Sequence, residues 1–169
     1  GGGEGYGDIA ETGDLIVRTK DELLACLQEA EPGQVVFVPG EVEIDLAGTM
    51  GIGIPAGVTL ASDRGRDGSA GALLHNRTTS GTQFVVRGDN ARITGIRLEG
   101  PHSGTELIAA SSVGISSGYY ATEVDNCEIF NWNIRGIGIG QGGSRAHIHH
   151  NHIHHCQRSG YGSGVSVSP

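Results

Sequence analysis

The chain has 169 residues, a formal net charge of −8, thirty glycines, and Lys20 as its only lysine. This length suits one domain with a substantial core, and the acidic charge argues against a nucleic-acid binder that follows phosphates with a basic stripe. No apolar run approaches the roughly 20 residues of a membrane-spanning helix, so no membrane span is expected. Abundant glycine between many short β-branched runs indicates an all-β chain with many turns.

A helix is predicted over about residues 19–31, within "TKDELLACLQEAEPG". Thr19 can cap its N-terminus and Glu22 completes a capping box. Pro32-Gly33 is a typical helix stop. The apolar face of this helix consists of Leu23, Leu24 and Leu27.

From residue 34 onward the hydrophobic period changes from helical to alternating, which is typical of β-strands. Short β-type runs are bounded by Gly, Asn, Asp or Pro: "QVVFVPG", "GVTLAS", "ARITGIRLEG", "TEVDNCEIFN" and "AHIHHNHIHHC". Each coil is therefore expected to contain two or three short strands and no helix.

These runs superpose on one another as a repeat. Three apolar columns shift together by 31 and then by 24 residues: Ile93, Val124 and Ile148; Leu98, Ile129 and Ile153; Phe84, Ile115 and Ile139. Val38 and Leu60 extend the first column backwards. A unit of a little over twenty residues predicts a solenoid whose coils stack as parallel sheets, as in a β-helix.

Polar residues follow the same repeat in three further columns: Arg92, Glu123 and His147; Arg97, Glu128 and His152; Thr94, Asp125 and His149. We expect these columns on one outer face, because neighbouring coils lie roughly 4.8 Å apart. Gly95, Asn126 and His150 form a corner column, since glycine and asparagine tolerate left-handed backbone. Stacked Arg, Glu and His side chains could stabilise a solvated sheet or form an active site.

The opening segment Val17–Gly48 and the motifs "ARITGIRLEG", "TEVDNCEIFNW" and "HIHHNHIHHC" resemble the right-handed parallel β-helix family, the pectate lyase-like superfold. The resemblance implies a right-handed parallel β-helix over residues 17–169 with a short N-terminal capping helix, preceded by an extension over residues 1–16. It also implies a secreted or cell-surface location. Lyases, hydrolases, epimerases, adhesins and phage spikes share this architecture, so the resemblance is specific for fold only.

The lyases of this family imply an acidic polysaccharide as partner and Ca²⁺ as a potential cofactor. In that hypothesis an arginine binds the substrate carboxylate bidentately and a neutral histidine acts as base. The candidate catalytic residues are His149, His152, Arg97, Glu128 and Asp125, and the candidate substrate-binding residues are Arg92, Glu123, His147, Tyr119 and Tyr120. A cage of several close carboxylates, as a Ca²⁺ site needs, is not evident. The alternative is a non-catalytic structural or adhesive β-helix.

The run "HIHHNHIHHC" (147–156) invites interpretation as a metal site. On the repeat, however, Ile148 and Ile153 fall in buried columns, so the six histidines divide among different faces and cannot all reach one ion. His147 and His149 then share one face, and His152 and His154 share another. We predict no native metal site, although such a pair could bind Zn²⁺ or Ni²⁺ adventitiously.

The last run, "SGYGSGVSVSP", aligns Val167 with Ile139 and predicts an incomplete last coil. An open solenoid end exposes apolar interior and unpaired strand backbone. The expectation is a fragment of a longer β-helix, a further chain that supplies the next coils, or self-association through this end.

Overall fold

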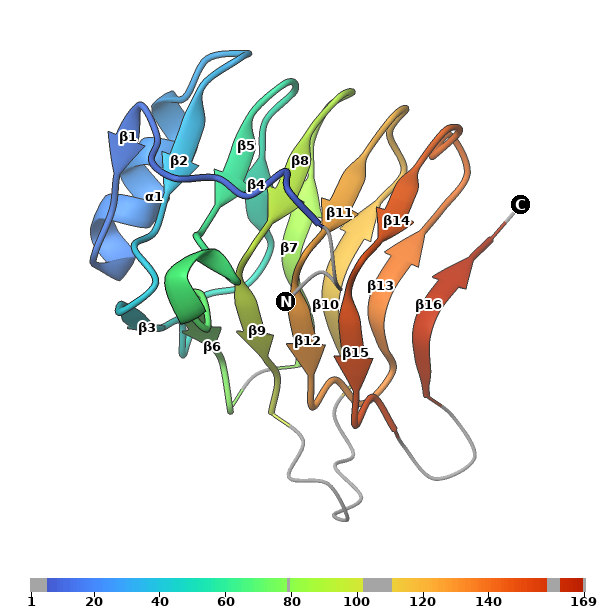
Figure 1. Ribbon diagram of the computed structural model, residues 1–169. Coiled ribbons are helices and arrows are strands. Elements are labelled where there is room, and N and C mark those ends of the chain that lie inside the picture. Colours follow the sequence, from blue (N-terminus) through green and yellow to red (C-terminus); the bar gives the residue numbers. More distant parts are fainter. Residues whose placement is uncertain (1–5, 79, 102–110, 158–161, 169) are drawn as a thin grey trace.

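The computed structural model describes residues 6–78, 80–101, 111–157 and 162–168, and shows three parallel sheets stacked as a β-helix (Figure 1). Sheet A contains β1 (Leu15–Ile16), β2 (Val35–Phe37), β5 (Thr59–Ala61), β8 (Arg92–Thr94), β11 (Glu123–Asp125) and β14 (His147–His149). Sheet B contains β3 (Glu43–Asp45), β6 (Leu73–His75), β9 (Arg97–Glu99), β12 (Glu128–Phe130) and β15 (His152–His154). Sheet C contains β4 (Ile52–Ile54), β7 (Gly81–Val86), β10 (Ser112–Ser117), β13 (Arg135–Ile139) and β16 (Ser163–Val167). The predicted all-β parallel solenoid is confirmed.

Helix α1 (Lys20–Glu29) covers one end of the solenoid (Figure 1). The predicted capping box is present, with Thr19 accepting from the backbone of Glu22 and Glu22 accepting in return. Leu23 and Leu27 are buried against the first coils. The helix ends two residues earlier than predicted, because Ala30 adopts an extended conformation. Among the described residues, no helix has the length and apolarity that crossing a membrane requires.

The predicted inward columns are confirmed, with two corrections of register. Ile93 pairs with Leu60 and Val124, and Ile115 pairs with Phe84. The partner of Leu60 on the other side is Val36, two residues before the predicted Val38. Likewise, Ile115 pairs with Ile137 and not with the predicted Ile139. A slip of two residues keeps the same side chains inside, so alternation alone cannot distinguish these registers.

The corner between sheets A and B requires left-handed backbone, as the sequence predicts. Gly95, Asn126 and His150 have φ values of 68°, 52° and 51°. One strand later, Asn131 and His155 have φ values of 66° and 51°. In each of the last two coils, a three-residue strand followed by a left-handed residue thus occurs twice, and the two left-handed residues are five positions apart.

The N-terminal residues are more than an extension. Leu15–Ile16 forms β1, which pairs with β2 at the edge of sheet A. The segment before it runs along the outer side of sheet A as far as β11 (Figure 1), where Tyr6 donates a hydrogen bond to Asp125. Residues 6–16 therefore cover part of the outer face of sheet A, where the first and third predicted polar columns lie.

At the other end, the predicted pairing of Val167 with Ile139 is confirmed. Ile137 and Ile139, the partners of Val165 and Val167 in the preceding coil, are buried, whereas Val165 is 40% and Val167 71% exposed. The apolar interior of the solenoid is therefore accessible at β16. Tyr161 lies outside the described residues.

Candidate functional site

The three polar columns have the predicted register. Arg92 pairs with Glu123 and Glu123 with His147; Arg97 pairs with Glu128 and Glu128 with His152; Thr94 pairs with Asp125 and Asp125 with His149. The expectation that they share one outer face is wrong. The left-handed corner at Asn126 separates them, so that the first and third columns lie on sheet A and the second on sheet B. The predicted catalytic residues are thereby divided between two surfaces.

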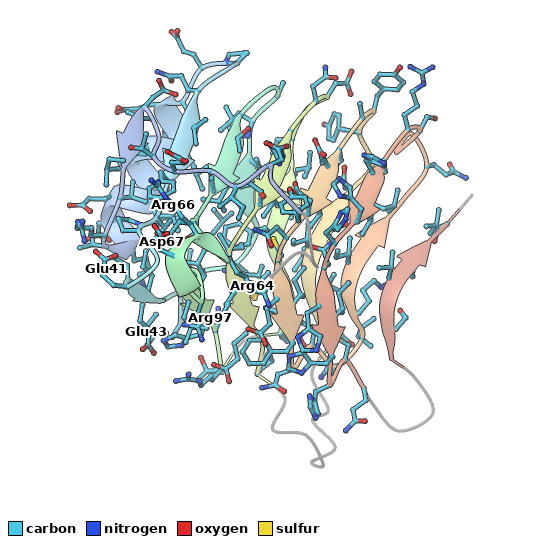
Figure 2. The ribbon with its side chains drawn as sticks, in the orientation of Figure 1. Glu41, Glu43, Arg64, Arg66, Asp67 and Arg97 are labelled. Atoms are coloured by element: carbon cyan, nitrogen blue, oxygen red, sulfur yellow. The ribbon has the colours of Figure 1, made fainter. Side chains whose placement is uncertain are left out.

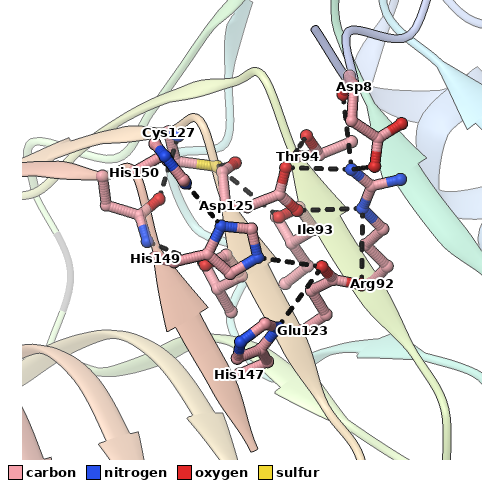
Figure 3. A network of polar contacts seen from close by, with 12 residues as sticks. Asp8, Arg92, Ile93, Thr94, Glu123, Asp125, Cys127, His147, His149 and His150 are labelled. Atoms are coloured by element: carbon pink, nitrogen blue, oxygen red, sulfur yellow. Dashed lines mark hydrogen bonds and ion pairs between the residues drawn. The ribbon is translucent and has the colours of Figure 1, made fainter. Parts of the chain in front are cut away.

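On sheet A, Arg92 and Asp125 form a bidentate ion pair (Figure 3). Arg92 Nε lies 2.9 Å from Asp125 Oδ1, and Arg92 Nη2 lies 2.9 Å from Asp125 Oδ2. The hydroxyl of Thr94 donates to the same carboxylate at 2.7 Å. The phenol of Tyr6 also donates to it. Asp8 accepts from Arg92 Nη2 at 2.7 Å. The guanidinium and the carboxylate are thus both engaged by the protein itself.

The side chain of Asp125 has no exposed surface. Burial by itself would raise the pKa of this carboxyl, but the hydrogen bonds from Arg92, Tyr6 and Thr94 outweigh it and hold the pKa below its ordinary value. Burial, followed by the hydrogen bond to Asp125, raises the pKa of Tyr6. An ionised, enclosed Asp125 bound to Arg92 stabilises the stack of coils and the N-terminal segment, and it offers no open atom to a substrate.

A carboxylate and two imidazoles meet beside this pair on sheet A. Glu123 Oε1 lies 2.9 Å from His149 Nε2 and 3.9 Å from His147 Nδ1. The side chains of His149 and Glu123 are 24% and 32% exposed, and that of His147 is 73% exposed. His150, which follows in the corner, places its Nδ1 2.7 Å from Nδ1 of His149 (Figure 3). The group is therefore compact and accessible from solvent.

The same arrangement recurs on sheet B. Glu128 Oε1 lies 3.2 Å from His154 Nε2 and 3.5 Å from His152 Nδ1. His155 Nδ1 lies 2.6 Å from His154 Nδ1, and Phe130 stacks on the ring of His154 with 5.1 Å between centroids. The sequence predicted that His147 and His149 share one face and His152 and His154 another, and both statements hold. The stacking of Glu123 with His147 and of Glu128 with His152 was also predicted, but the contacts of His149 and His154 with the same two glutamates were not.

Arg97 occupies the coil next to Glu128 in the sheet B column. Its Nε donates to the backbone oxygen of Gly71 at 3.0 Å. Arg64, which is 7% exposed, packs against the same glycine, and Figure 2 shows the two arginines beside each other. Within the described part of the chain, no carboxylate oxygen lies within 4.0 Å of either guanidinium. Sequence reasoning missed Arg64, because nothing in its local pattern indicates proximity to Arg97.

The aromatic candidates are placed differently. Tyr119 and Tyr120 are each 41% exposed, in the turn that joins β10 to β11. This turn is at the corner between sheets C and A, at the opposite end of β11 from sheet B. Trp132, by contrast, is fully buried and donates to the backbone oxygen of Leu98 at 3.2 Å. The structure therefore does not bring the two tyrosines to the sheet B column.

Comparisons of the chain with protein-family models, with curated proteins and with solved structures gave no match. The parallel β-helix is established by the strand pairing described above. Kinship with the pectate lyase-like family stays a prediction.

Proposed function

We propose that the protein is an extracellular carbohydrate-active β-helix, polysaccharide lyase-like, that binds or cleaves an acidic glycan on the outer face of sheet B. A parallel β-helix supports this proposal, because it stacks side chains from successive coils at a regular spacing of about 4.8 Å, on which a polymeric substrate can extend. Secretion or exposure at the cell surface belongs to the same proposal, since such polymers are extracellular.

The observation that carries the proposal is the positive charge of Arg97. Its guanidinium is half-buried, bonded by Nε to a backbone oxygen, and without a described carboxylate partner. In a chain of net charge −8, the neighbouring Arg64 and Arg97 make this a local site for an anion. A uronate carboxylate is planar and accepts the paired N–H groups of a guanidinium.

Glu128 and His152 supply the remaining chemistry. The carboxylate of Glu128 lies 3.5 Å from His152 Nδ1, so it can orient the imidazole whose other nitrogen acts as base. In β-elimination this base removes the proton at C5 of the uronate while Arg97 neutralises the carboxylate. The C4–O bond then breaks, the leaving oxygen takes up a proton, and a C4=C5 double bond forms.

The proposal is tested by incubating the purified chain with a panel of uronate polysaccharides, with and without Ca²⁺, and following the ultraviolet absorbance of the unsaturated product. Glycan binding is measured in parallel by affinity electrophoresis. We expect Arg97→Gln and His152→Gln to abolish turnover. Arg77→Gln is the matched control, because Arg77 is paired with Glu99 on the same sheet, and it should keep activity. Neither turnover nor binding on any acidic glycan would overturn the proposal.

A second function is favoured by one specific observation, the exposure of Val165 and Val167 on β16. These two valines continue columns that are buried in the preceding coil, so another copy of the chain could cover them by stacking on β16. Such stacking suits a structural or adhesive β-helix that self-associates. Analytical ultracentrifugation over a range of concentrations tests this function. Self-association that Val167→Lys abolishes supports it, and a monomer at all concentrations contradicts it.

A further inference from the structure

The sequence His-Ile-His-His occurs twice in succession, at residues 147–150 and 152–155. Each copy forms a three-residue strand followed by a left-handed residue. In the preceding coil, Glu123 and Glu128 are also five residues apart and pair with the first histidine of each copy. The two groups, Glu123-His147-His149 and Glu128-His152-His154, are therefore structural repeats of each other on adjacent sheets.

The spacing of their ligand atoms fits a small divalent cation. In each group one nitrogen from each histidine and one carboxylate oxygen lie within 4.8 Å of one another. Zinc bonds of about 2.0–2.1 Å at tetrahedral angles place ligand atoms about 3.3 Å apart. On sheet B the two oxygen-to-nitrogen distances are 3.2 and 3.5 Å. On sheet A they are 2.9 and 3.9 Å, on either side of the same value.

In each group, one histidine also has a partner for the ring nitrogen that does not face the glutamate. His149 Nδ1 meets His150 Nδ1 at 2.7 Å, and His154 Nδ1 meets His155 Nδ1 at 2.6 Å. When Nδ1 is the donor in this contact, Nε2 carries a free lone pair, and it is Nε2 that faces the glutamate. Metal-bound histidines commonly donate their second N–H to such a partner, which sets the tautomer and the ring orientation.

Aromatic contacts restrict the same rings. Tyr6 packs on His150 with 4.8 Å between ring centroids, and Phe130 stacks on His154 with an interplanar angle of 5°. The ligand-bearing histidines are on strands and not on loops, so the backbone that positions them is rigid. Both groups nevertheless remain partly exposed, which leaves room for a water molecule as a fourth ligand.

Contrary to the expectation from the sequence, which predicted no native metal site, we propose that Glu123-His147-His149 and Glu128-His152-His154 are two equivalent binding sites for a divalent transition-metal ion, with Zn²⁺ the preferred ion. Two imidazoles and one carboxylate are typical of zinc sites with an open fourth position. Ca²⁺ takes six to eight oxygen ligands and is not suited to this set. The proposal does not rest on glycan binding or cleavage, because ion binding is measured without a glycan. On sheet B the two uses are alternatives, since an ion bound to His152 Nδ1 leaves the proton on the other nitrogen, which then cannot act as the base.

The test is isothermal titration of the full chain with Zn²⁺ after removal of metals by a chelator. We expect two ions per chain, and Glu128→Gln or Glu123→Gln should each weaken one of the two sites by at least about tenfold. The double variant should lose both. Glu99→Gln is the matched control, because Glu99 is a partly buried carboxylate on the same face of sheet B that is paired with Arg77, and it should still bind two ions.

Co²⁺ provides a readout that reports geometry. Tetrahedral Co²⁺ absorbs visible light strongly, whereas a loosely bound, hydrated ion does not, so intense bands that disappear in the double variant support the proposal. Thermal unfolding of each variant without metal shows that the fold is intact. Binding that neither glutamine variant weakens, binding of fewer than two ions to the unaltered chain, or equal competition by Ca²⁺ would overturn it.

Discussion

Arg92 and Asp125 are joined by two hydrogen bonds of 2.9 Å each, although they belong to consecutive coils and lie on the outer side of the solenoid. The N-terminal segment covers this ion pair: Tyr6 donates a hydrogen bond to the carboxylate of Asp125, and Asp8 accepts one from the guanidinium of Arg92. One ion pair thus connects two coils and the chain segment that crosses them.

Replacing Asp125 with Asn should lower the free energy of unfolding by about 2–4 kcal/mol, because it leaves a largely buried guanidinium without its main counter-charge. Chemical denaturation measures this loss. Asp8→Asn is the matched control, since the side chain of Asp8 is 74% exposed and its removal should have a much smaller effect. Equal losses in the two variants would contradict the structural role of Asp125.

Stability should also fall in acid through the same carboxyl. The pKa of Asp125 in the folded protein lies below its ordinary value of 3.8, so between the two values the unfolded chain binds more protons and the free energy of unfolding increases with pH. The contribution is fully present above about pH 4 and is lost as the pH falls through the folded pKa. Chemical denaturation at several pH values between about 2 and 5 measures this. The free energy of unfolding should rise more steeply with pH for the unaltered chain than for Asp125→Asn, and identical slopes would refute this assignment.

The thiol of Cys127 should not react in the folded protein. Its side chain has no exposed surface, and burial raises its pKa to about 12, so the reactive thiolate is both rare and enclosed. Alkylation at about pH 8 followed by peptide mass spectrometry should modify Cys127 only after denaturant is added. Cys26, which is half-buried, serves as the internal comparison, and early modification of Cys127 would show that the coil opens locally.

Gly95 tests the packing of the corner between sheets A and B. It has a φ of 68°, and an added Cβ would lie 2.1 Å from the backbone oxygen of Ser62. Gly48 also has positive φ, at 77°, but an added Cβ there would meet nothing within 4 Å. Gly48→Ala should cost about 1–2 kcal/mol from left-handed backbone alone, and Gly95→Ala should cost clearly more in thermal or chemical unfolding. Similar losses would mean that the corner relaxes without strain.

Several features of the site were predictable because they depend on local periodicity. The alternation of apolar and polar residues identifies Val124 as inward and Glu123 and Asp125 as outward, and the steps between repeats identify their partners in adjacent coils. The same reasoning divided the histidines of 147–155 between two faces. It could not find the two-residue shift of Val36 and Ile137, since both registers bury the same class of side chain.

Other features depend on contacts that no local pattern encodes. The contact of Tyr6 with Asp125 spans 119 residues, and the proximity of Arg64 to Arg97 depends on where the loop around Gly71 packs. Two residues predicted to serve a substrate, Arg92 and Asp125, are for this reason bound to each other beneath the N-terminal segment.

The sequence by itself determined the stack of parallel coils, the helix that covers its first end, and which side chains point inward or outward, because these follow from short-range periodicity and capping. Only the tertiary structure decided that the corner at Asn126 places Glu123 and Glu128 on separate sheets, and that each meets a pair of histidines. The physical reason is that the repeat predicts a left-handed corner at Asn126 but not how far it turns the chain, nor which side chains of adjacent coils then meet.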